Sequence, residues 1–177
     1  MRLSTRSRYG VRLMLQLAAD YDNGRLSRLS EIARSQSVSV KYLEQIVLPL
    51  KRSRYVMSYR GVKGGHRLAR HPGEISVGEV VALLEDGPHV VECAGNVGVC
   101  ERADECVTRR LWKEASEAFF GKLNSLTFQD LVEQAAESGD DPAALCPEGA
   151  KVLTSPAGPV KDKKRPGRKV TATEPGP

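Results

Sequence analysis

Two short helical patterns followed at once by an alternating pattern constrain the fold of this chain more than any other feature. Leu29, Ile32 and Ala33 recur at helical spacing. Ser27 is a candidate N-cap for that helix, and the polar stretch SQSVS ends it. Ser39 can cap a second helix, whose apolar side consists of Tyr42, Leu43, Ile46, Val47 and Leu50. Two short helices joined by a tight turn form a helix-turn-helix.

The pattern changes directly after the second helix. Pro49 removes one backbone donor and is expected to kink that helix near its end. YVMSYR then alternates, GVKGG supplies turn chemistry, and HRLAR resumes an extended pattern, which together predict a β-hairpin. A hairpin after a helix-turn-helix is typical of a winged helix. With a further amphipathic helix expected at residues 8–22, we predict a mainly α fold.

Charge is distributed very unevenly along the chain. Residues 1–70 hold 15 Lys and Arg against 4 Asp and Glu, a net charge of +11, whereas residues 71–150 hold 5 against 16, a net charge of −11. A generally solvated basic surface explains a small excess but not one of this size. The basic half therefore indicates a module that binds a polyanion, and the helix-turn-helix makes double-stranded DNA the expected partner.

Side chains that would reach DNA can be named from this arrangement. Those that point away from the apolar side of the second helix in its first turns are Ser39, Lys41, Glu44 and Gln45, and the hairpin adds Arg60, Lys63 and Arg67. Gln pairs with adenine edges, Glu accepts from cytosine amino groups, and Arg can enter a narrow minor groove. Ordinary surface polarity for Glu44 and a generic phosphate contact for Arg60 are the alternatives.

The chain after the hairpin is expected to build a dimer. Ser76 and Glu79 form an S-x-x-E capping box for a helix over residues 76–86, and Thr127 starts a last short helix. Between them, residues 105–126 carry apolar residues every three or four positions: Val107, Leu111, Ala115, Ala118, Phe119, Leu123 and Leu126. Such a helix is too long for the small N-terminal domain to cover, so a second copy is its expected partner. A core helix in a monomer is the alternative.

Three of the four cysteines gather in one stretch, CAGNVGVCERADEC. The chain shows neither a membrane span nor the layout of a signal peptide, so we expect it in the cytoplasm, where thiols stay reduced. Zinc sites usually draw two ligands from a C-x₂₋₄-C pair, which Cys93, Cys100 and Cys106 do not form. Iron–sulfur clusters accept thiolates at looser spacing, so a cluster is favoured. A thiol redox switch without iron and a zinc site remain open.

The chain resembles the Rrf2 (BadM-type) family of winged-helix repressors from Met1 to about Val132. The stretches that carry the resemblance are MRLSTRSRYGVRLMLQLA, VSVKYLEQI, YRGVKGGHRLAR, EISVGEVVALLE and CVTRRLWKEASEAFFGKLNSLTFQDL. The resemblance implies a homodimer centred on the long helix, two winged helices on a pseudo-palindromic operator, and an iron–sulfur cluster on Cys93, Cys100 and Cys106. It also implies DNA contacts at Ser39, Glu44, Gln45 and Arg60.

Departures from the family pattern leave the fourth ligand of that cluster unknown. Six residues separate the first two cysteines, where the family's cluster assembly regulators have five. Arg109 stands where those regulators have a histidine ligand, and Arg8 stands where a nitric-oxide sensor can use an aspartate of the partner subunit. Arginine stays protonated and cannot ligate iron. The candidates are His89, Asp104, Glu105, Cys146 and a solvent-derived ligand. Three thiolates without an evident imidazole favour 4Fe–4S over 2Fe–2S.

We therefore predict a DNA-binding regulator, expected to be a repressor, whose operator binding depends on an iron–sulfur cluster that senses cluster status, nitric oxide or redox stress. An iron–sulfur carrier or electron-transfer protein is a further alternative. An enzyme is not predicted, because no Ser-His-Asp set, phosphate-cradling loop or suggestive carboxylate pair is present. The predicted organisation is a winged-helix domain at 1–86, a cysteine loop at 87–106, the dimerisation helix and a short helix at 107–137, and a disordered tail at 138–177.

Overall fold

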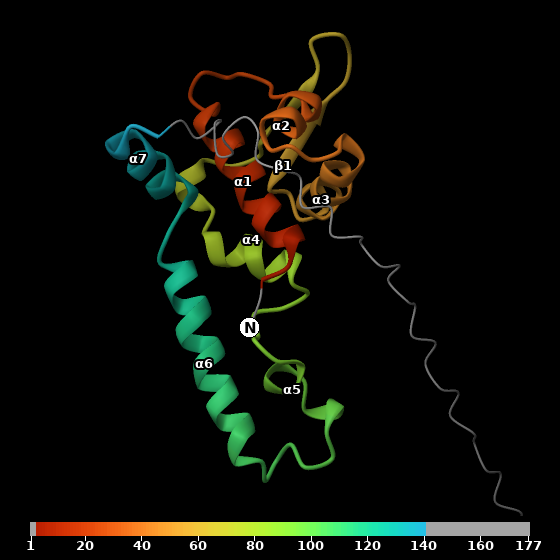
Figure 1. Ribbon diagram of the computed structural model, residues 1–177, viewed down its shortest axis with the longest axis vertical. Helices are drawn as coiled ribbons and strands as arrows, with labels where there is room; N and C mark the ends of the chain where they lie inside the picture. Colours follow the sequence, from red (N-terminus) through yellow and green to blue (C-terminus); the bar gives the residue numbers. More distant parts are fainter. Residues whose placement is uncertain (1–2, 141–177) are drawn as a thin grey trace, which may run out of the picture.

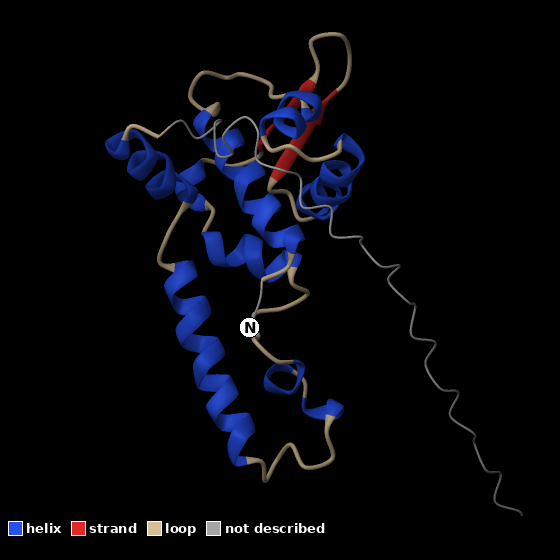
Figure 2. Cartoon of the chain, in the orientation of Figure 1, coloured by secondary structure: helices blue, strands red, loops and turns tan. Residues whose placement is uncertain are grey.

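The computed structural model describes residues 3–140, so Cys146 and the predicted tail beyond Asp140 lie outside the described residues. The helices are α1 (Thr5–Ala19), α2 (Leu29–Ser35), α3 (Val40–Arg52), α4 (Val77–Leu84), α5 (Glu92–Gly95), α6 (Val107–Asn124) and α7 (Phe128–Ser138), with 3-10 turns at Pro72–Glu74 and Val97–Val99 (Figure 1). Strands β1 (Val56–Tyr59) and β2 (Gly65–Leu68) pair as one hairpin (Figure 2). The predicted mainly α fold is confirmed. No described helix has both the length and the apolar character needed to cross a membrane.

One apolar core joins α1 to α3, α4 and the base of the hairpin. Leu13, Met14 and Leu17 of α1 are almost completely buried in it. Helix α1 begins at Thr5, earlier than expected, because the Ser4 hydroxyl caps it by accepting the backbone N–H of Ser7 at 3.1 Å. Helices α1 and α4 also come into close contact, since the α4 residue Leu84 leaves no room for a Cβ at Gly10 of α1.

Helices α2 and α3 form the predicted helix-turn-helix. The Ser39 hydroxyl caps α3, as expected, by accepting the backbone N–H of Tyr42 at 3.2 Å. The residues buried along α3 are Leu43, Ile46, Val47 and Leu50, which match the predicted apolar side apart from the half-buried Tyr42. Helix α3 continues through Pro49 to Arg52, where the backbone N–H of Ser53 bonds the Pro49 carbonyl.

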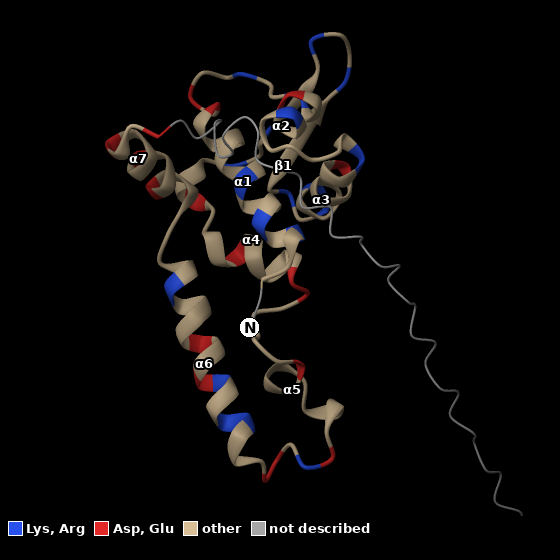
Figure 3. Cartoon of the chain, viewed as in Figure 1, with Lys and Arg blue, Asp and Glu red and all other residues tan. Residues whose placement is uncertain are grey.

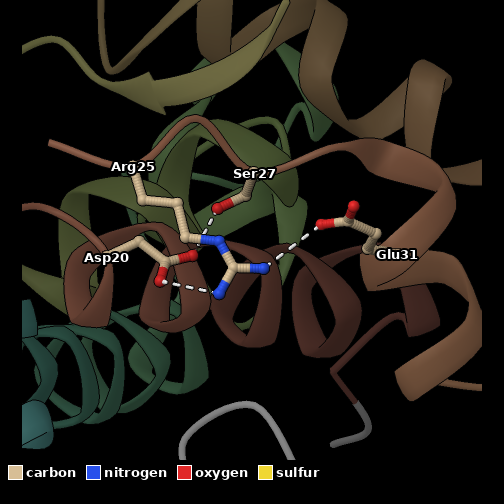
Figure 4. Close-up of polar contacts among 4 residues, drawn as sticks. All are labelled: Asp20, Arg25, Ser27 and Glu31. Atoms are coloured by element: carbon tan, nitrogen blue, oxygen red, sulfur yellow. Dashed lines mark hydrogen bonds and ion pairs between the residues drawn. The ribbon is translucent and has the colours of Figure 1, made fainter. Parts of the chain in front are cut away.

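Ser27 does not cap α2, so that prediction was wrong. Its hydroxyl donates to the Asp20 carboxylate instead, and its backbone pairs with His66 through N–H···O bonds of 3.0 and 2.8 Å. Arg25 lies between Asp20 and Glu31, at 4.0 and 3.5 Å from their carboxylate oxygens (Figure 4). This polar cluster joins the end of α1 to α2, although the exposed Arg25 pairs contribute little stability by themselves.

The hairpin forms the predicted wing and is tied to the helix-turn-helix at its turn. The strands are antiparallel with Met57 opposite Arg67, and Gly61 begins the turn with a φ of +112° that favours glycine. The Arg28 guanidinium, just before α2, donates to the Val62 carbonyl at 2.6 Å. This contact holds the turn against α2, while the Val62 side chain stays 91% exposed.

Helices α4 and α7 begin as predicted, whereas α6 covers Val107–Asn124 and is two residues shorter at each end than the expected 105–126. Helix α6 runs away from the body of the molecule (Figure 1). Both capping boxes are present, at Ser76 before α4 and Thr127 before α7, and α4 ends at Leu84, before the expected Gly87. The predicted apolar stripe of α6 is divided between two environments. Its C-terminal half meets the core, where Phe120 is buried. Its N-terminal half exposes Val107, Leu111 and Trp112, by 77%, 57% and 42%.

Candidate DNA-binding surface and cysteine site

The exposed face of α3 gathers four of the predicted DNA contacts. Ser39, Lys41, Glu44 and Gln45 are all exposed there, opposite the buried face that holds α3 against the core. Two apolar residues that sequence reasoning missed, Val40 and Leu48, are 39% and 48% exposed. By helical spacing Leu48 lies between Glu44 and Lys41 on this face. The signal for Leu48 was its position opposite the apolar stripe, and an exposed apolar group on such a helix suits a thymine methyl.

The wing contributes two exposed cations and one that is partly covered. Arg60 precedes the exposed turn and Lys63 lies within it, and Figure 3 shows basic residues at the tip of the hairpin. Arg67 is half-buried instead, with its guanidinium 5.6 Å from the centre of the Tyr21 ring. The neighbouring His66 is half-buried as well, and its burial, followed by the charge of Lys51, lowers its pKa. His66 is therefore neutral at pH 7 and adds no charge to the wing.

A basic pocket at the base of the wing extends this surface. Its volume is about 350 Å³, and its lining consists of Lys51, Arg54, Val56, Met57, Ala69 and Arg70. The Arg70 guanidinium lies 5.0 Å from the centre of the Tyr55 ring. The pocket lining contains three cations and no carboxylate, so it adds positive charge between the end of α3 and the wing.

The three cysteines of the loop occupy different local structures. Cys93 lies in α5, Cys100 follows the 97–99 turn, and Cys106 is the N-cap of α6. All three are free of disulfides, and Cys93 and Cys106 are half-buried while Cys100 is exposed. The cysteine loop therefore contains short helical segments. Within residues 3–140, no three His, Cys, Asp or Glu side chains lie together in a way that could hold a metal ion.

Cys106 is the thiol best prepared to act as a ligand. Its Sγ lies 3.1 Å from the Thr108 hydroxyl, and this hydrogen bond, with the backbone N–H of Arg109, lowers the Cys106 pKa. The thiolate, and not the thiol, is the form that binds iron and other metals. The donor chemistry of the loop thus fits an iron–sulfur cluster, but in the described residues the three thiols do not form one ligand group.

The candidates for a fourth ligand are scattered around the loop. Asp104 and Glu105 are exposed. The His89 imidazole lies directly over Gly95 of α5, so closely that a Cβ at Gly95 would be 2.2 Å from Cε1 of the ring. Arg109, at the family's ligand position, is half-buried and donates its Nε–H to the Cys93 carbonyl at 2.8 Å. Nothing in the sequence signals this contact, because it joins residues 16 positions apart.

Comparison with known proteins gives a consistent result. The model of the family described as "Rrf2: Iron-dependent Transcriptional regulator" matches residues 3–134. The chain is 39% identical over 150 residues to "Protein rrf2" of Nitratidesulfovibrio vulgaris, covering 85% of this chain and 94% of that one. It is 37% identical over 132 residues to "HTH-type transcriptional regulator IscR" of Klebsiella pneumoniae, covering 75% and 80%.

The fold agrees with the sequence comparison. The solved structure of CymR, "the Global Cysteine Regulator of B. subtilis", superposes with a TM-score of 0.62 at 33% identity, covering 76% of this chain and 98% of that one. These relatives are transcriptional regulators and not enzymes. The chain therefore belongs to the Rrf2 family of winged-helix transcriptional regulators.

Proposed function

We propose that this protein is a cytoplasmic repressor that binds a DNA operator as a homodimer, under the control of an iron–sulfur cluster on the cysteine loop. The observation that carries the DNA-binding part is the exposed face of α3, where an acid and an amide stand among cations beside a basic wing. Binding to phosphates alone would disfavour Glu44 on that face. The mixed chemistry supports direct reading of base edges in the major groove.

A second copy of the chain is the proposed partner of α6. Val107, Leu111 and Trp112 form an exposed apolar surface at its N-terminal half. A groove of about 320 Å³ lies among α1, α4 and α6 and is lined mainly by apolar residues: Leu3, Ser7, Arg8, Val11, Arg12, Val77, Val81 and Leu123. Two such surfaces facing each other would bury these side chains and set the spacing of two recognition helices.

Cys93, Cys100 and Cys106 would hold the cluster, with 4Fe–4S favoured over 2Fe–2S and the fourth ligand not assigned. When bound, such a cluster supplies a group that reacts with oxidants and nitric oxide and is easily lost. The protein's part is to couple the loop to α6. The Ser116 hydroxyl of α6 accepts the backbone N–H of Val90 at 3.0 Å, and Arg109 bonds Cys93. If the cysteine loop became more or less ordered, the position of α6 and the spacing of the two recognition helices would change with it.

A thiol redox switch without iron is the second candidate, and two observations favour it. The lowered Cys106 pKa makes this thiol a better nucleophile at neutral pH, and CymR, a cysteine regulator by its name, shares the fold. A zinc-containing regulator keeps the same DNA surface. A carrier or electron-transfer protein would instead show no sequence-specific DNA binding. Iron and sulfide analysis of anaerobically purified protein distinguishes a regulator with a cluster from a thiol switch and from a zinc-containing regulator.

Replacing Arg60 by alanine is expected to weaken operator binding by about 1–3 kcal/mol, because an exposed guanidinium beside the wing turn suits a narrow minor groove. Fluorescence anisotropy against the operator and a scrambled duplex measures the change. Lys63→Ala, which removes an equal charge from the same turn, is the matched control and should weaken both duplexes alike. Equal losses for Arg60→Ala on the two duplexes would leave Arg60 as a phosphate contact only.

Replacing Glu44 by alanine is expected to change operator preference more than total affinity. A carboxylate that accepts from a cytosine amino group distinguishes base pairs by about 1–3 kcal/mol, and its loss should relax one position of the operator. Selection from a randomised duplex library reports that position. Glu74→Ala, at an exposed carboxylate on the 72–74 turn, is the control. An unchanged selected sequence for Glu44→Ala would rule out direct reading by this residue.

A further inference from the structure

Arg109 makes two hydrogen bonds that join two of the cysteines. Its backbone N–H donates to the Cys106 carbonyl at 3.2 Å, as part of the first turn of α6. Its side-chain Nε–H donates to the Cys93 carbonyl in α5 at 2.8 Å. One residue thus links the backbones of Cys93 and Cys106, and its side chain is half-buried in doing so.

A second contact holds the same segment on the same face of α6. The buried Ser116 hydroxyl accepts the backbone N–H of Val90 at 3.0 Å and donates to the Trp112 carbonyl at 2.7 Å. Arg109 and Ser116 are seven positions apart, about two helical turns, so they project from one side of α6. The segment that contains α5 is therefore attached to α6 at two points: at Val90, just before α5, and at Cys93 within it.

Cys100 has no bond to α6 among the described residues: its carbonyl accepts the backbone N–H of Ala103, in the same loop, at 3.1 Å. It is exposed, and among the described residues no hydrogen bond is formed by its thiol. The two outer cysteines of the loop are held by α6, and the middle one is not. Cys93 and Cys106 are therefore held in position by α6, whereas Cys100 would have to move toward them to share a ligand.

We propose that Arg109 is a positioning residue that holds Cys93 beside Cys106 before any metal or oxidant arrives, and so leaves Cys100 as the thiol that completes the site. The inference rests on the proposed role of these thiols in regulation. A guanidinium suits the task, because it is always charged, planar and a strong donor to a carbonyl. Holding two reacting groups in place in advance removes part of the entropy cost of bringing them together.

The proposal can be tested in metal-free, full-length protein that carries Cys100→Ser and Cys146→Ser, which leaves Cys93 and Cys106 as its thiols. Dibromobimane is the probe: each thiolate displaces one bromide from a CH₂Br arm, and fluorescence rises once both arms have reacted. Arg109→Gln, Arg109→Lys and the neighbouring, exposed Arg110→Gln are compared with this parent. Far-ultraviolet circular dichroism is recorded for each variant to establish that the helices are retained.

We expect the cross-linking rate of Arg109→Gln to fall about tenfold or more, the order that one lost hydrogen bond to a charged donor implies. Arg109→Lys should fall similarly, since it keeps the charge but lacks the Nε donor, and Arg110→Gln should stay near the parent rate. An unchanged rate for Arg109→Gln, or full recovery with lysine, would overturn the proposal. A protein that never binds iron yet shows the Arg109 effect would refute the cluster and retain the positioning role.

Discussion

Replacing Leu111 by aspartate is expected to convert the proposed dimer into monomers and to reduce operator affinity about a hundredfold or more. Leu111 is 57% exposed in the single chain, so the substitution should leave the fold of the monomer intact. In a dimer built on α6 the new carboxylate would be buried without a partner, at a cost of ~3–5 kcal/mol. A monomer also reaches only one operator half-site, so it loses the joint binding of two recognition helices.

Analytical ultracentrifugation and operator titration on the same samples give both quantities. Lys113→Asp is the matched control, because it places the same side chain on α6 at a position whose ion pair with Glu117 is solvent-exposed. The control should remain dimeric. A Leu111→Asp protein that also stays dimeric would exclude the exposed N-terminal half of α6 from the dimer interface.

Replacing Cys100 by serine is expected to abolish the visible chromophore of the anaerobically purified protein while leaving its oligomeric state and melting temperature nearly unchanged. A serine hydroxyl is a poor substitute for thiolate toward iron. The fold should not change, since Cys100 is exposed and lies outside the apolar core. Operator binding should then become insensitive to conditions that destroy a cluster.

Val97→Ser provides the comparison for that experiment, because it introduces the same side chain at an exposed position of the same loop. It should retain colour and iron. If Cys100→Ser keeps the full spectrum and the full iron content of the parent, Cys100 is not a ligand. If the parent itself is colourless after reconstitution but responds to oxidants, the thiol switch replaces the cluster as the regulatory device.

Much of the DNA-binding half could be predicted from the sequence, because its helices and caps are determined by residues that are close together in the chain. The apolar positions of α3 identify the buried face, and the polar residues between them identify the face left for DNA. The Ser76–Glu79 capping box depends on residues three positions apart and was predicted, as was the start of the last helix at Thr127, where the structure shows a second box. Ser27 failed as an N-cap because a distant strand competes for it: its backbone pairs with His66 in the wing.

The contacts that attach the wing and the cysteine loop could not be predicted from the sequence. Arg28 bonds the Val62 carbonyl 34 positions away, and Arg109 bonds the Cys93 carbonyl 16 positions away. In each contact a side chain donates to a backbone carbonyl. Every residue has such a carbonyl, so the residue type of the acceptor does not indicate the contact. The position of Arg109 indicated only that it cannot ligate iron; the structure shows what it bonds instead.

Operator affinity of one anaerobic preparation, measured before and after its cluster is removed by a chelator, tests the central claim most directly. Iron and sulfide analysis accompanies each titration, and sedimentation establishes that the protein is still dimeric. We expect the dissociation constant to change about tenfold or more, a coupling of ~1.4 kcal/mol between the loop and the DNA-binding surface. Superimposable titrations from samples that demonstrably contain and lack the cluster would contradict control of this regulator by an iron–sulfur cluster.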